Sequence, residues 1–503
     1  MFTIFFVSKC YLCAVKNRYL SPFFVILTIV CYLGLLLLLS FRAGRGADNA
    51  TFFIGNRRTK WSVATLAMIG AAMSGVTYIS LPASVAADGF TYMQMVIGFT
   101  IGQLVVAFVL VPLFYRLKVV SLYEYLNGIF GVTTHRTGAL CFLVSKLIGS
   151  ALKLYVVCAV LQMLVFDELN ICFNLNILLT MLVVYLFTFK GGVRSLIVTD
   201  VLQSLCLVVS VVAAIWFICN ELGLSVKQTL EVVQSSPYSR MWCFDDASSA
   251  RYFWKMVAGG ALSLVAMTGL DQDMMQRNLS CRTKRDSQIN IVLTAVCQAV
   301  VILLFLVLGV LLYRYADVER LPAPNRYDDI FPMVAVQGGL PLIVGILFVT
   351  GLISSTYSAA GSALTSLTTS FTIDILGGGS EAQLSHRRRL VHIVMAVVMT
   401  IVIMIFARFG SDGVINLVFR VAGYTYGPIL GLFAFGLMCK RAVRGRYVPI
   451  VVILSPVLSY LLQWSAARYF DYHIGFELLG YNALFCIFGL LLISYKSCKN
   501  ENI

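Results

Sequence analysis

One stretch of the chain, residues 351–372, combines the length of a membrane-spanning helix with many hydroxyl groups and no charged residue. Its serines and threonines include five at the spacing i, i+3, i+7, i+11 and i+14, which places them on one stripe of a helix. They are Ser355, Ser358, Ser362, Ser366 and Thr369. Such a stripe can hold a dehydrated cation, because hard cations take oxygen ligands. The same residues also allow membrane helices to pack closely, and on this segment alone packing is the simpler interpretation.

Ionisable residues inside apolar segments are the next candidates, since they are costly in a membrane and often mark function. Asp200 lies about one and a half turns inside the end of its segment, either as an interfacial carboxylate or as a functional one. Lys146 and Lys153 share one helix face by their i, i+7 spacing. Lys153 lies near the middle of its segment and needs an anion. That anion is either an internal carboxylate such as Asp200 or the carboxylate of a substrate.

The elements that must position these residues are membrane helices. Hydrophobic residues make up 59% of the 503 residues and charged residues only 12%, with a mean hydropathy of +0.88. A soluble domain carries about twice that charged fraction. We therefore predict an all-α polytopic membrane protein of about 13 transmembrane helices, each near the length that spans a bilayer. The apolar segments are residues 22–41, 62–83, 92–115, 138–165, 174–189, 195–219, 254–271, 289–313, 338–373, 390–407, 413–438, 447–465 and 478–495.

The net charge of +15 does not indicate nucleic acid, because the basic residues gather in alternate loops. Examples are Arg57, Arg116, Arg194, Arg282 and Arg388. The positive-inside rule assigns these loops to the cytoplasm. It predicts a multi-pass protein of the plasma membrane, or of the inner membrane in a bacterium, with its N terminus outside and its C terminus in the cytoplasm. Residues 1–21 form an N-terminal extension, in which the basic residues follow the apolar ones and so do not make a secretory signal.

Glycine and proline mark places where two segments can unwind. Segment 62–83 contains Gly70 and Gly75, and segment 413–438 contains Gly423, Gly427 and Pro428. Broken helices in a membrane bundle line binding sites, because their freed carbonyl groups need a partner. Each glycine can equally serve close packing. Two broken segments in one bundle favour a transporter.

Several sequence motifs resemble those of the sodium:solute symporter family. The strongest match is GLDQDMMQRNLSCRTKRDSQ at 269–288. The other motifs also occur in family order, and they are SLYEYL at 121–126, GGVRSLIVTDVLQ at 191–203 and GYTYGPILGLFAFG at 423–436. The resemblance covers residues 22–465. It implies the five-plus-five inverted repeat of the leucine transporter. Residues 22–41 would then precede the core, 62–219 and 254–438 would be the two repeats, and 447–495 would form two C-terminal helices.

The resemblance also implies a sodium site between the first core helix and the hydroxyl-rich segment. Gly70 and Met73 match positions whose backbone carbonyls bind the ion, and Ser355 matches a third carbonyl position. Ser358 matches the first of two hydroxyl ligands. Ala359 occupies the second hydroxyl position, so this chain lacks one expected oxygen ligand.

Neighbouring residues bear on how many ions bind. Thr356, another carbonyl or water can replace the missing ligand. Asp200 matches the carboxylate beneath the site, which joins a second sodium ion in some family members. Ser358 and Ser362 match hydroxyls of that second site, but the intervening family serine is Gly361. This pattern favours one sodium ion with Asp200 tuning its binding.

The substrate-binding candidates are Ser74, Thr77 and Lys153. Ser74 matches a position near both ion and solute in proline-type members, while Val76 and Thr77 replace the larger polar pair of sugar-type members and so disfavour a hexose. Lys153, if it faces the cavity, suits a carboxylate-bearing solute such as a sialic-type acid, an amino acid or a monocarboxylate.

These features together predict a sodium-coupled secondary active symporter that imports a small organic solute by alternating access. We expect no catalytic residues, no cofactor and no metal other than the coupling sodium ion. The expected partners are the solute and the lipid bilayer, without nucleic acid or an obligate protein partner. The alternative is a solute sensor or a channel-like protein on the same fold.

Overall fold

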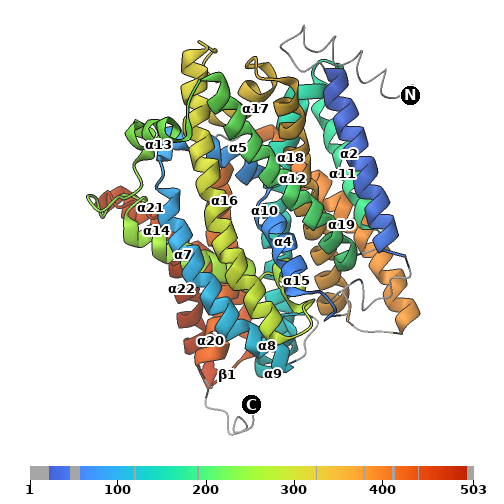
Figure 1. The fold of residues 1–503 in the computed structure, drawn as a ribbon. Helices are drawn as coiled ribbons and strands as arrows, with labels where there is room; N and C mark the ends of the chain where they lie inside the picture. Colours follow the sequence, from blue (N-terminus) through green and yellow to red (C-terminus); the bar gives the residue numbers. More distant parts are fainter. Residues whose placement is uncertain are drawn as a thin grey trace.

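The computed structural model describes residues 22–45, 52, 57–117, 121–189, 192–324, 326–377, 380–409, 414–439 and 441–495. The predicted extension at 1–21 lies outside them. The described chain is a bundle of helices with one antiparallel two-residue strand pair, β1 and β2 (Figure 1).

The elements of the first half up to residue 239 are α2 Pro22–Ala43, α4 Trp61–Ala72, α5 Gly75–Ala83, α6 Val85–Asp88, α7 Tyr92–Val105, η2 Val106–Leu110, α8 Val111–Leu117, α9 Glu124–Phe130, α10 Val132–Leu161, η3 Gln162–Phe166, α11 Phe173–Thr188, α12 Gly192–Glu221, α13 Val226–Ser235 and η4 Pro237–Ser239. Those of the second half are α14 Phe253–Leu264, η5 Val265–Gly269, α15 Gln272–Leu279, α16 Lys284–Val318, η6 Tyr327–Asp329, α17 Ile330–Pro332, η7 Met333–Gln337, α18 Leu342–Ser370, η8 Phe371–Ile375, α19 Glu381–Phe409, α20 Val414–Met438, β1 Ala442–Val443, η9 Gly445–Tyr447, α21 Val448–Phe470, α22 Leu478–Leu492 and β2 Ser494–Tyr495.

Each predicted apolar segment coincides with one of these helices or with a bent pair. Within the described residues, nine helices are long and apolar enough to cross a membrane, and eleven if each of two bent pairs is one span. Phe173–Thr188 and Leu478–Leu492 are apolar but shorter. The polytopic all-helical fold is therefore confirmed, whereas the number of about 13 spans is not.

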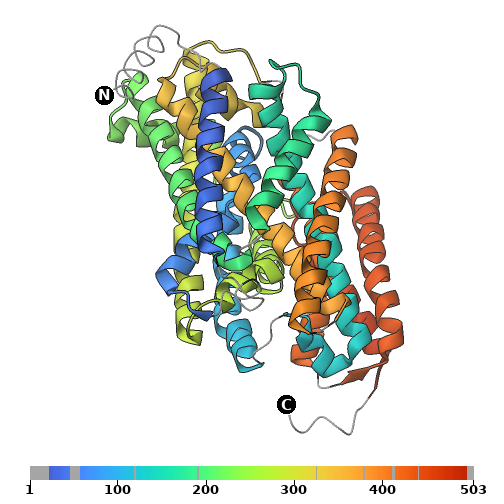
Figure 2. The same cartoon turned by 90° about the vertical axis from the view of Figure 1, so that its right-hand side faces the viewer.

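The hydroxyl-rich helix α18 lies in the interior of the bundle. Two thirds of the apolar windows of α10 and α18 are buried, compared with 22% for α2 and α21 at the periphery. Figure 1 shows α2, α11 and α19 on one side of the bundle and α21 and α22 on the other. In Figure 2 the view from the side of α2 shows this helix lying over α12 and α18, which it contacts. Between Gly351 and Ser370, every residue except Ala359 is fully buried.

Two helices are broken, and each stands at the start of one predicted repeat. The pair α4 and α5 bends by 60°, with Met73 and Ser74 in extended conformations between them. The helix formed by α14 and η5 bends by 66° relative to α15. Here Asp271 caps the new helix by accepting hydrogen bonds from the amides of Asp273 and Met274. A broken helix at the same place in both repeats is the arrangement expected of inverted-repeat transporters.

The suggested break in segment 413–438 is wrong, because α20 is one continuous helix. Its glycines serve packing: a Cβ added to Gly427 would lie 2.5 Å from the side chain of Asn482 on α22. In a regular helix the carbonyl of Tyr424 would accept a hydrogen bond from the amide of residue 428, but Pro428 has no amide hydrogen to donate. The Asn482 amide donates to that carbonyl at 2.8 Å and to the Gly423 carbonyl at 3.0 Å. A neighbouring helix thus satisfies the freed groups, and α20 does not unwind.

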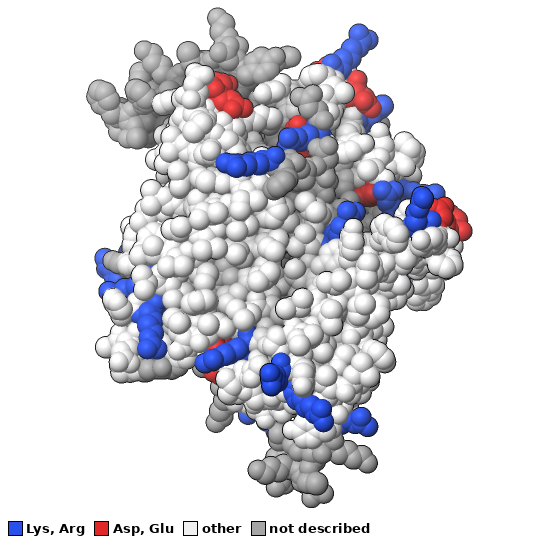
Figure 3. Space-filling model, turned by 180° about the vertical axis from the view of Figure 1, so that it is seen from behind, with Lys and Arg blue, Asp and Glu red and all other residues white. Residues whose placement is uncertain are grey.

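The surface agrees with a multi-pass membrane protein. Figure 3 shows a broad, largely uncharged band across the middle of the face that it presents, with most charged side chains towards the two ends. Large apolar side chains are exposed on the outer faces of α2, α19 and α21. Exposed apolar surface of this extent is suited to lipid, not water.

Candidate functional site

The break between α4 and α5 leaves backbone carbonyl groups free. The Met73 amide donates to the Ile69 carbonyl at 3.0 Å, and the series resumes with Tyr78 donating to the Ser74 carbonyl at 3.0 Å. Among the described residues, no backbone amide donates to the carbonyls of Gly70 or Met73 outside these two series. The two predicted carbonyl ligands thus lie where helical hydrogen bonding stops.

Gly70 brings this break close to α12. A Cβ added to Gly70 would lie 2.5 Å from Ser204 Oγ and 3.0 Å from the carbonyl oxygen of Asp200. Only glycine permits such an approach without a shift of the neighbouring helix. The unwound backbone and the helix that carries Asp200 are therefore direct neighbours.

The hydroxyl helix α18 lies against the other side of the break. A Cβ added to Gly75 would lie 2.8 Å from Thr356 Oγ1 and 3.7 Å from Ser355 Oγ. Both hydroxyls donate to the Leu352 carbonyl, from 2.6 Å and 3.0 Å respectively, which leaves their lone pairs free. The structure thus brings Gly75 next to the hydroxyls of Ser355 and Thr356.

A small cavity of about 30 Å³ lies where the second hydroxyl ligand is expected. Gly75, Thr356, Ala359 and Ser362 line it together with Lys153. Ala359 therefore lies at the cavity, and the hydroxyl residues of its own helix that line the same cavity are Thr356 and Ser362, three residues away on either side.

Ser358 contacts Asp200 on α12. Its hydroxyl donates to Asp200 Oδ1 at 2.6 Å, and Arg277 Nε donates to Asp200 Oδ2 at 3.0 Å. The internal partner of Asp200 is therefore Arg277, and the suggested Lys153–Asp200 pair is not formed. Gly361 faces α11, since a Cβ there would lie 2.8 Å from the methyl group of Thr188.

Arg277 belongs to a buried network that joins α10, α12, α15, α18 and α20. Asp273 contacts Arg277, accepts from Lys146 Nζ at 2.8 Å and accepts from the Ser362 hydroxyl at 3.0 Å. Lys146 Nζ also lies 3.1 Å from Asp271. The Tyr426 hydroxyl donates to Asp271 at 2.6 Å. Three carboxylates, including that of Asp200, thus meet two cations.

The sequence alone did not identify Asp271, Asp273 and Arg277 as parts of this network. The signal was present in the motif DQDMMQR, where Asp273 and Arg277 stand at i, i+4 and so share a helix face. It could have been found by asking which anion neutralises Lys146. In contrast, Ser366 and Thr369 donate only to carbonyls of their own helix, as expected of packing residues.

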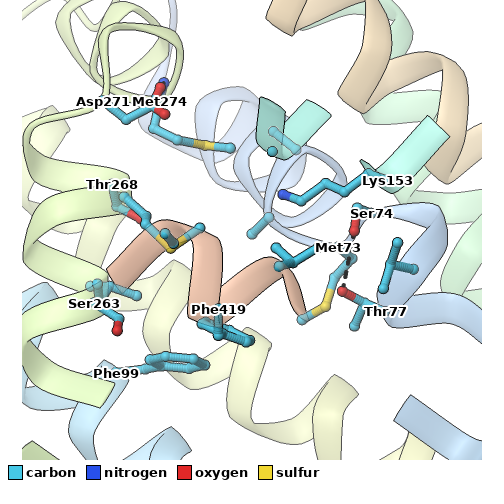
Figure 4. A pocket seen from close by; sticks show the side chains of 18 of the residues that line it. Met73, Ser74, Thr77, Phe99, Lys153, Ser263, Thr268, Asp271, Met274 and Phe419 are labelled. Atoms are coloured by element: carbon cyan, nitrogen blue, oxygen red, sulfur yellow. Dashed lines mark hydrogen bonds between the residues drawn. The ribbon is translucent and has the colours of Figure 1, made fainter. Parts of the chain in front are cut away.

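A central cavity of about 140 Å³ opens beside the break (Figure 4). Met73, Ser74 and Thr77 line it from the break, Phe99 from α7, Lys153 from α10 and Phe419 from α20. The hydroxyls of Ser74 and Thr77 lie 3.5 Å apart. All three predicted substrate-binding residues therefore face one cavity.

Lys153 extends its ammonium group into this cavity, as Figure 4 shows. It makes no hydrogen bond or ion pair with any side chain that the structure describes, whereas Lys146, two turns earlier on the same face, contacts two carboxylates. Lys153 therefore has no internal carboxylate, such as that of Asp200, among its direct contacts. The other anion considered for it is the carboxylate of a substrate.

Comparison with known proteins agrees with this geometry. The sodium:solute symporter family model matches residues 52–445. The chain is 24% identical to the human sodium/iodide cotransporter over 406 residues, which is 78% of this chain and 61% of that protein. It is 23% identical to sodium-coupled monocarboxylate transporter 2 of Danio rerio over 80% of this chain and 66% of that protein. The chain thus spans less than two thirds of these two relatives.

A bacterial relative and a solved structure match over more of their length. The sodium/sialic acid symporter SiaT of Proteus mirabilis is 24% identical over 83% of this chain and 84% of that protein. A solved Na⁺-coupled sialic acid symporter in a substrate-bound outward-open state superposes with a TM-score of 0.79 and 21% identity, over 94% of this chain and 99% of that one. These relatives are transporters and not enzymes by name, and the solved one shares the fold. With the family model matching most of its length, the chain belongs to the sodium:solute symporter family.

Proposed function

We propose that the protein is a sodium-coupled symporter that imports a small carboxylate-bearing solute by alternating access. One observation carries this proposal: residues of the α4–α5 break, the α18 residues Thr356 and Ser362, and Lys153 with its unpartnered ammonium all line two adjoining cavities. Oxygen ligands suit the ion, and an ammonium suits a carboxylate.

Sodium would bind between the break and α18. The proposed ligands are the carbonyls of Gly70, Met73 and Ser355 and the hydroxyl of Ser358, with Thr356 in place of the side chain that Ala359 lacks. An ion there would hold the break in the conformation that presents Ser74 and Thr77 to the solute. Ion binding would thereby favour solute binding, because each ligand stabilises the same arrangement of the two helices.

The solute would place its carboxylate at Lys153. A buried charge without a partner is costly, and an anionic ligand would remove that cost. The cavity of about 140 Å³ is comparable to the roughly 150 Å³ cavity that holds one benzene molecule. This volume supports a monocarboxylate or a small amino acid over a larger sialic-type acid.

We further propose that Asp200 tunes a single sodium site electrostatically. Each of its oxygens already accepts a hydrogen bond, one from Ser358 and the other from Arg277. Joint binding of one sodium ion and one carboxylate would leave the net charge of the site unchanged.

The proposed orientation in the plasma membrane has the N terminus outside and the C terminus in the cytoplasm. The end of the molecule that bears β1 carries mainly basic side chains in Figure 3, and the opposite end carries both signs. This asymmetry supports the assignment by the positive-inside rule.

Uptake into proteoliposomes tests the symport proposal. The purified full-length chain is reconstituted, and accumulation of labelled monocarboxylates, amino acids and sialic acid is followed with and without an inward sodium gradient. Accumulation above equilibrium only with the gradient is the expected result. Downhill flux without accumulation would indicate a channel-like protein. Binding without any flux would indicate a sensor.

A further inference from the structure

A groove of about 490 Å³ lies on the surface between α4, η2 and α16. Trp61 of α4, Phe108 of η2 and Arg285 of α16 line it, together with further residues of α16. Figure 1 shows the lower part of α16 beside α4 and α8, both of which it contacts. The side-chain amide of Gln288, which also lines the groove, donates to the Ala107 carbonyl of η2 at 3.1 Å. This bond holds two walls of the groove together.

The apolar part of the groove has the length of one membrane leaflet. Arg285 is followed on the same face of α16 by apolar residues at i+4, i+7 and i+11. They are Ile289, Val292 and Val296, and all of them line the groove. The helix from 285 to 296 is about 16 Å long, which is close to half of a hydrocarbon core about 30 Å thick. An extended acyl chain can therefore lie along this face.

Trp61 marks the level of the membrane interface on the opposite wall. It directly precedes the apolar segment 62–83, and its side chain is exposed. Tryptophan is enriched at this level, between headgroups and hydrocarbon. A backbone bridge pairs Thr59 with Cys281, and the Thr59 amide donates to the Ser280 carbonyl at 3.0 Å. The starts of α4 and α16 are therefore held side by side at one interface.

The same bridge gathers basic residues at the entrance of the groove. Residues 57–60 and 282–285 contain six Lys or Arg, and Asp286, which directly follows, is the one acidic residue beside them in the sequence. Arg282 Nε donates to the Arg58 carbonyl at 3.1 Å, so the two basic segments are direct neighbours. Basic clusters at the edge of membrane helices attract anionic lipid headgroups.

Arg285 connects this basic cluster with the groove. Its side chain is exposed, lines the groove and makes no hydrogen bond or ion pair with any residue that the structure describes. A guanidinium can bind a phosphate through two parallel hydrogen bonds. An apolar groove of leaflet length that ends at such a guanidinium is complementary to a phospholipid.

We infer that one anionic phospholipid binds between α4, η2 and α16, with an acyl chain along α16 and its phosphate at Arg285. This site does not depend on the symport proposal. Only its assignment to the cytoplasmic leaflet uses the proposed orientation, and that leaflet is the one rich in anionic lipids.

Lipid binding to the purified full-length protein tests the inference. The protein is stripped of lipid in a neutral detergent, and native mass spectrometry follows titrations with dioleoyl phosphatidylglycerol and dioleoyl phosphatidylcholine, which differ only in the headgroup. One phosphatidylglycerol is expected to bind at least about ten-fold more tightly, because each nearby Lys or Arg contributes about five-fold. Inorganic phosphate should not displace it, because phosphate has no acyl chain.

Charge variants locate the headgroup. Arg285→Gln should weaken phosphatidylglycerol binding by about five-fold, and adding Lys60→Gln should weaken it by about five-fold again. Arg446→Gln is the matched control, because it removes one exposed basic residue on η9, next to β1 at the same end of the molecule but outside the groove. It should leave the binding unchanged.

A second pair of variants locates the acyl chain. Val296→Trp fills the groove and should weaken phosphatidylglycerol binding by about ten-fold, as for loss of about two buried methylene groups. Val209→Trp, at a similarly exposed valine of α12 outside the groove, should not. Thermal unfolding without added lipid checks that each variant folds, and Ile289→Trp replaces Val296→Trp if that variant does not.

Three results would overturn the inference. They are equal affinity for the two lipids, displacement of the lipid by inorganic phosphate, and phosphatidylglycerol binding that is unchanged in the charge variants or in the groove-filling variant. Specific lipid binding without sodium-driven uptake would refute the symport proposal and leave the lipid site standing.

Discussion

Lys153 differs from the other basic side chains beside the two cavities. Lys146 and Arg277 each contact two aspartates, whereas Lys153 contacts none. Lys146 and Arg277 are therefore part of the structural network, and Lys153 is available to a ligand. The same distinction separates Ser358, which contacts Asp200, from Ser366, which bonds only within α18.

Replacing Lys153 with methionine should strongly reduce transport without destabilising the protein. No described ion pair is broken, so the melting temperature in detergent should stay the same or rise, while uptake of the carboxylate solute should fall by about ten-fold or more. Lys146→Met is the matched control, and it should lower the melting temperature because it leaves Asp271 and Asp273 with less positive charge. Unchanged uptake in Lys153→Met would refute the proposed role.

Ser358→Ala should weaken sodium activation more than expression. The change removes a proposed ligand and also the hydroxyl that donates to Asp200 at 2.6 Å. We expect the sodium concentration for half-maximal uptake to rise by about ten-fold, as for loss of one buried hydrogen bond to a charged group. The measurement is solute uptake over a sodium titration, with Ser366→Ala as the unaffected control. Identical titration curves for both variants would place the ion elsewhere.

At the scale of elements, α15 is the helix that joins the two predicted repeats through charge. Asp273 and Arg277 project from it to α10, α12 and α18. The bend before α15 makes this possible, because it turns the helix that carries these side chains by 66° from the axis of α14. The broken helix thus positions the ion pairs as well as the cavity wall.

Arg277→Met should destabilise the protein strongly. Its side chain is 2% exposed and contacts Asp200 and Asp273, which are also buried. Removing one partner of a buried ion pair costs about 3–5 kcal/mol. Thermal unfolding in detergent should show a large drop, and a second change, Asp200→Asn, should recover part of it by removing one stranded charge. Lys284→Met, at an exposed position, is the control and should unfold like the unmodified protein.

At the scale of the whole molecule, the charge carried in each transport cycle follows from the number of ions bound. Cotransport of one sodium ion with one monocarboxylate moves no net charge. Cotransport of two sodium ions with one monocarboxylate moves one positive charge. The Gly361 position, and the pairing of Asp200 with Ser358 and Arg277, favour one ion.

Uptake of a monocarboxylate should therefore be insensitive to membrane potential. A potential of 100 mV is worth about 2.3 kcal/mol per charge, which corresponds to roughly a 50-fold change in accumulation for a cycle that moves one charge. Proteoliposomes with a potassium diffusion potential provide the measurement. Accumulation that rises steeply when the interior is made negative would indicate a second sodium ion.

The sequence by itself determined the helices, the first broken helix and the hydroxyl face of α18. These properties are local: apolar runs of bilayer length form helices, and the spacing of Ser355, Ser358 and Ser362 fixes the face they share. The family resemblance added the identity of the fold. It also added the expectation of a sodium site, which stays a prediction.

Only the tertiary structure decided which charged and polar groups meet. Arg277 and Asp200 are 77 residues apart, and Gln103 and Gln298 are 195 apart, so no local pattern pairs them. The continuity of α20 likewise depends on Asn482, which reaches it from α22. In a membrane, buried polar groups must find partners inside the protein, and which partner each finds depends on how the helices pack.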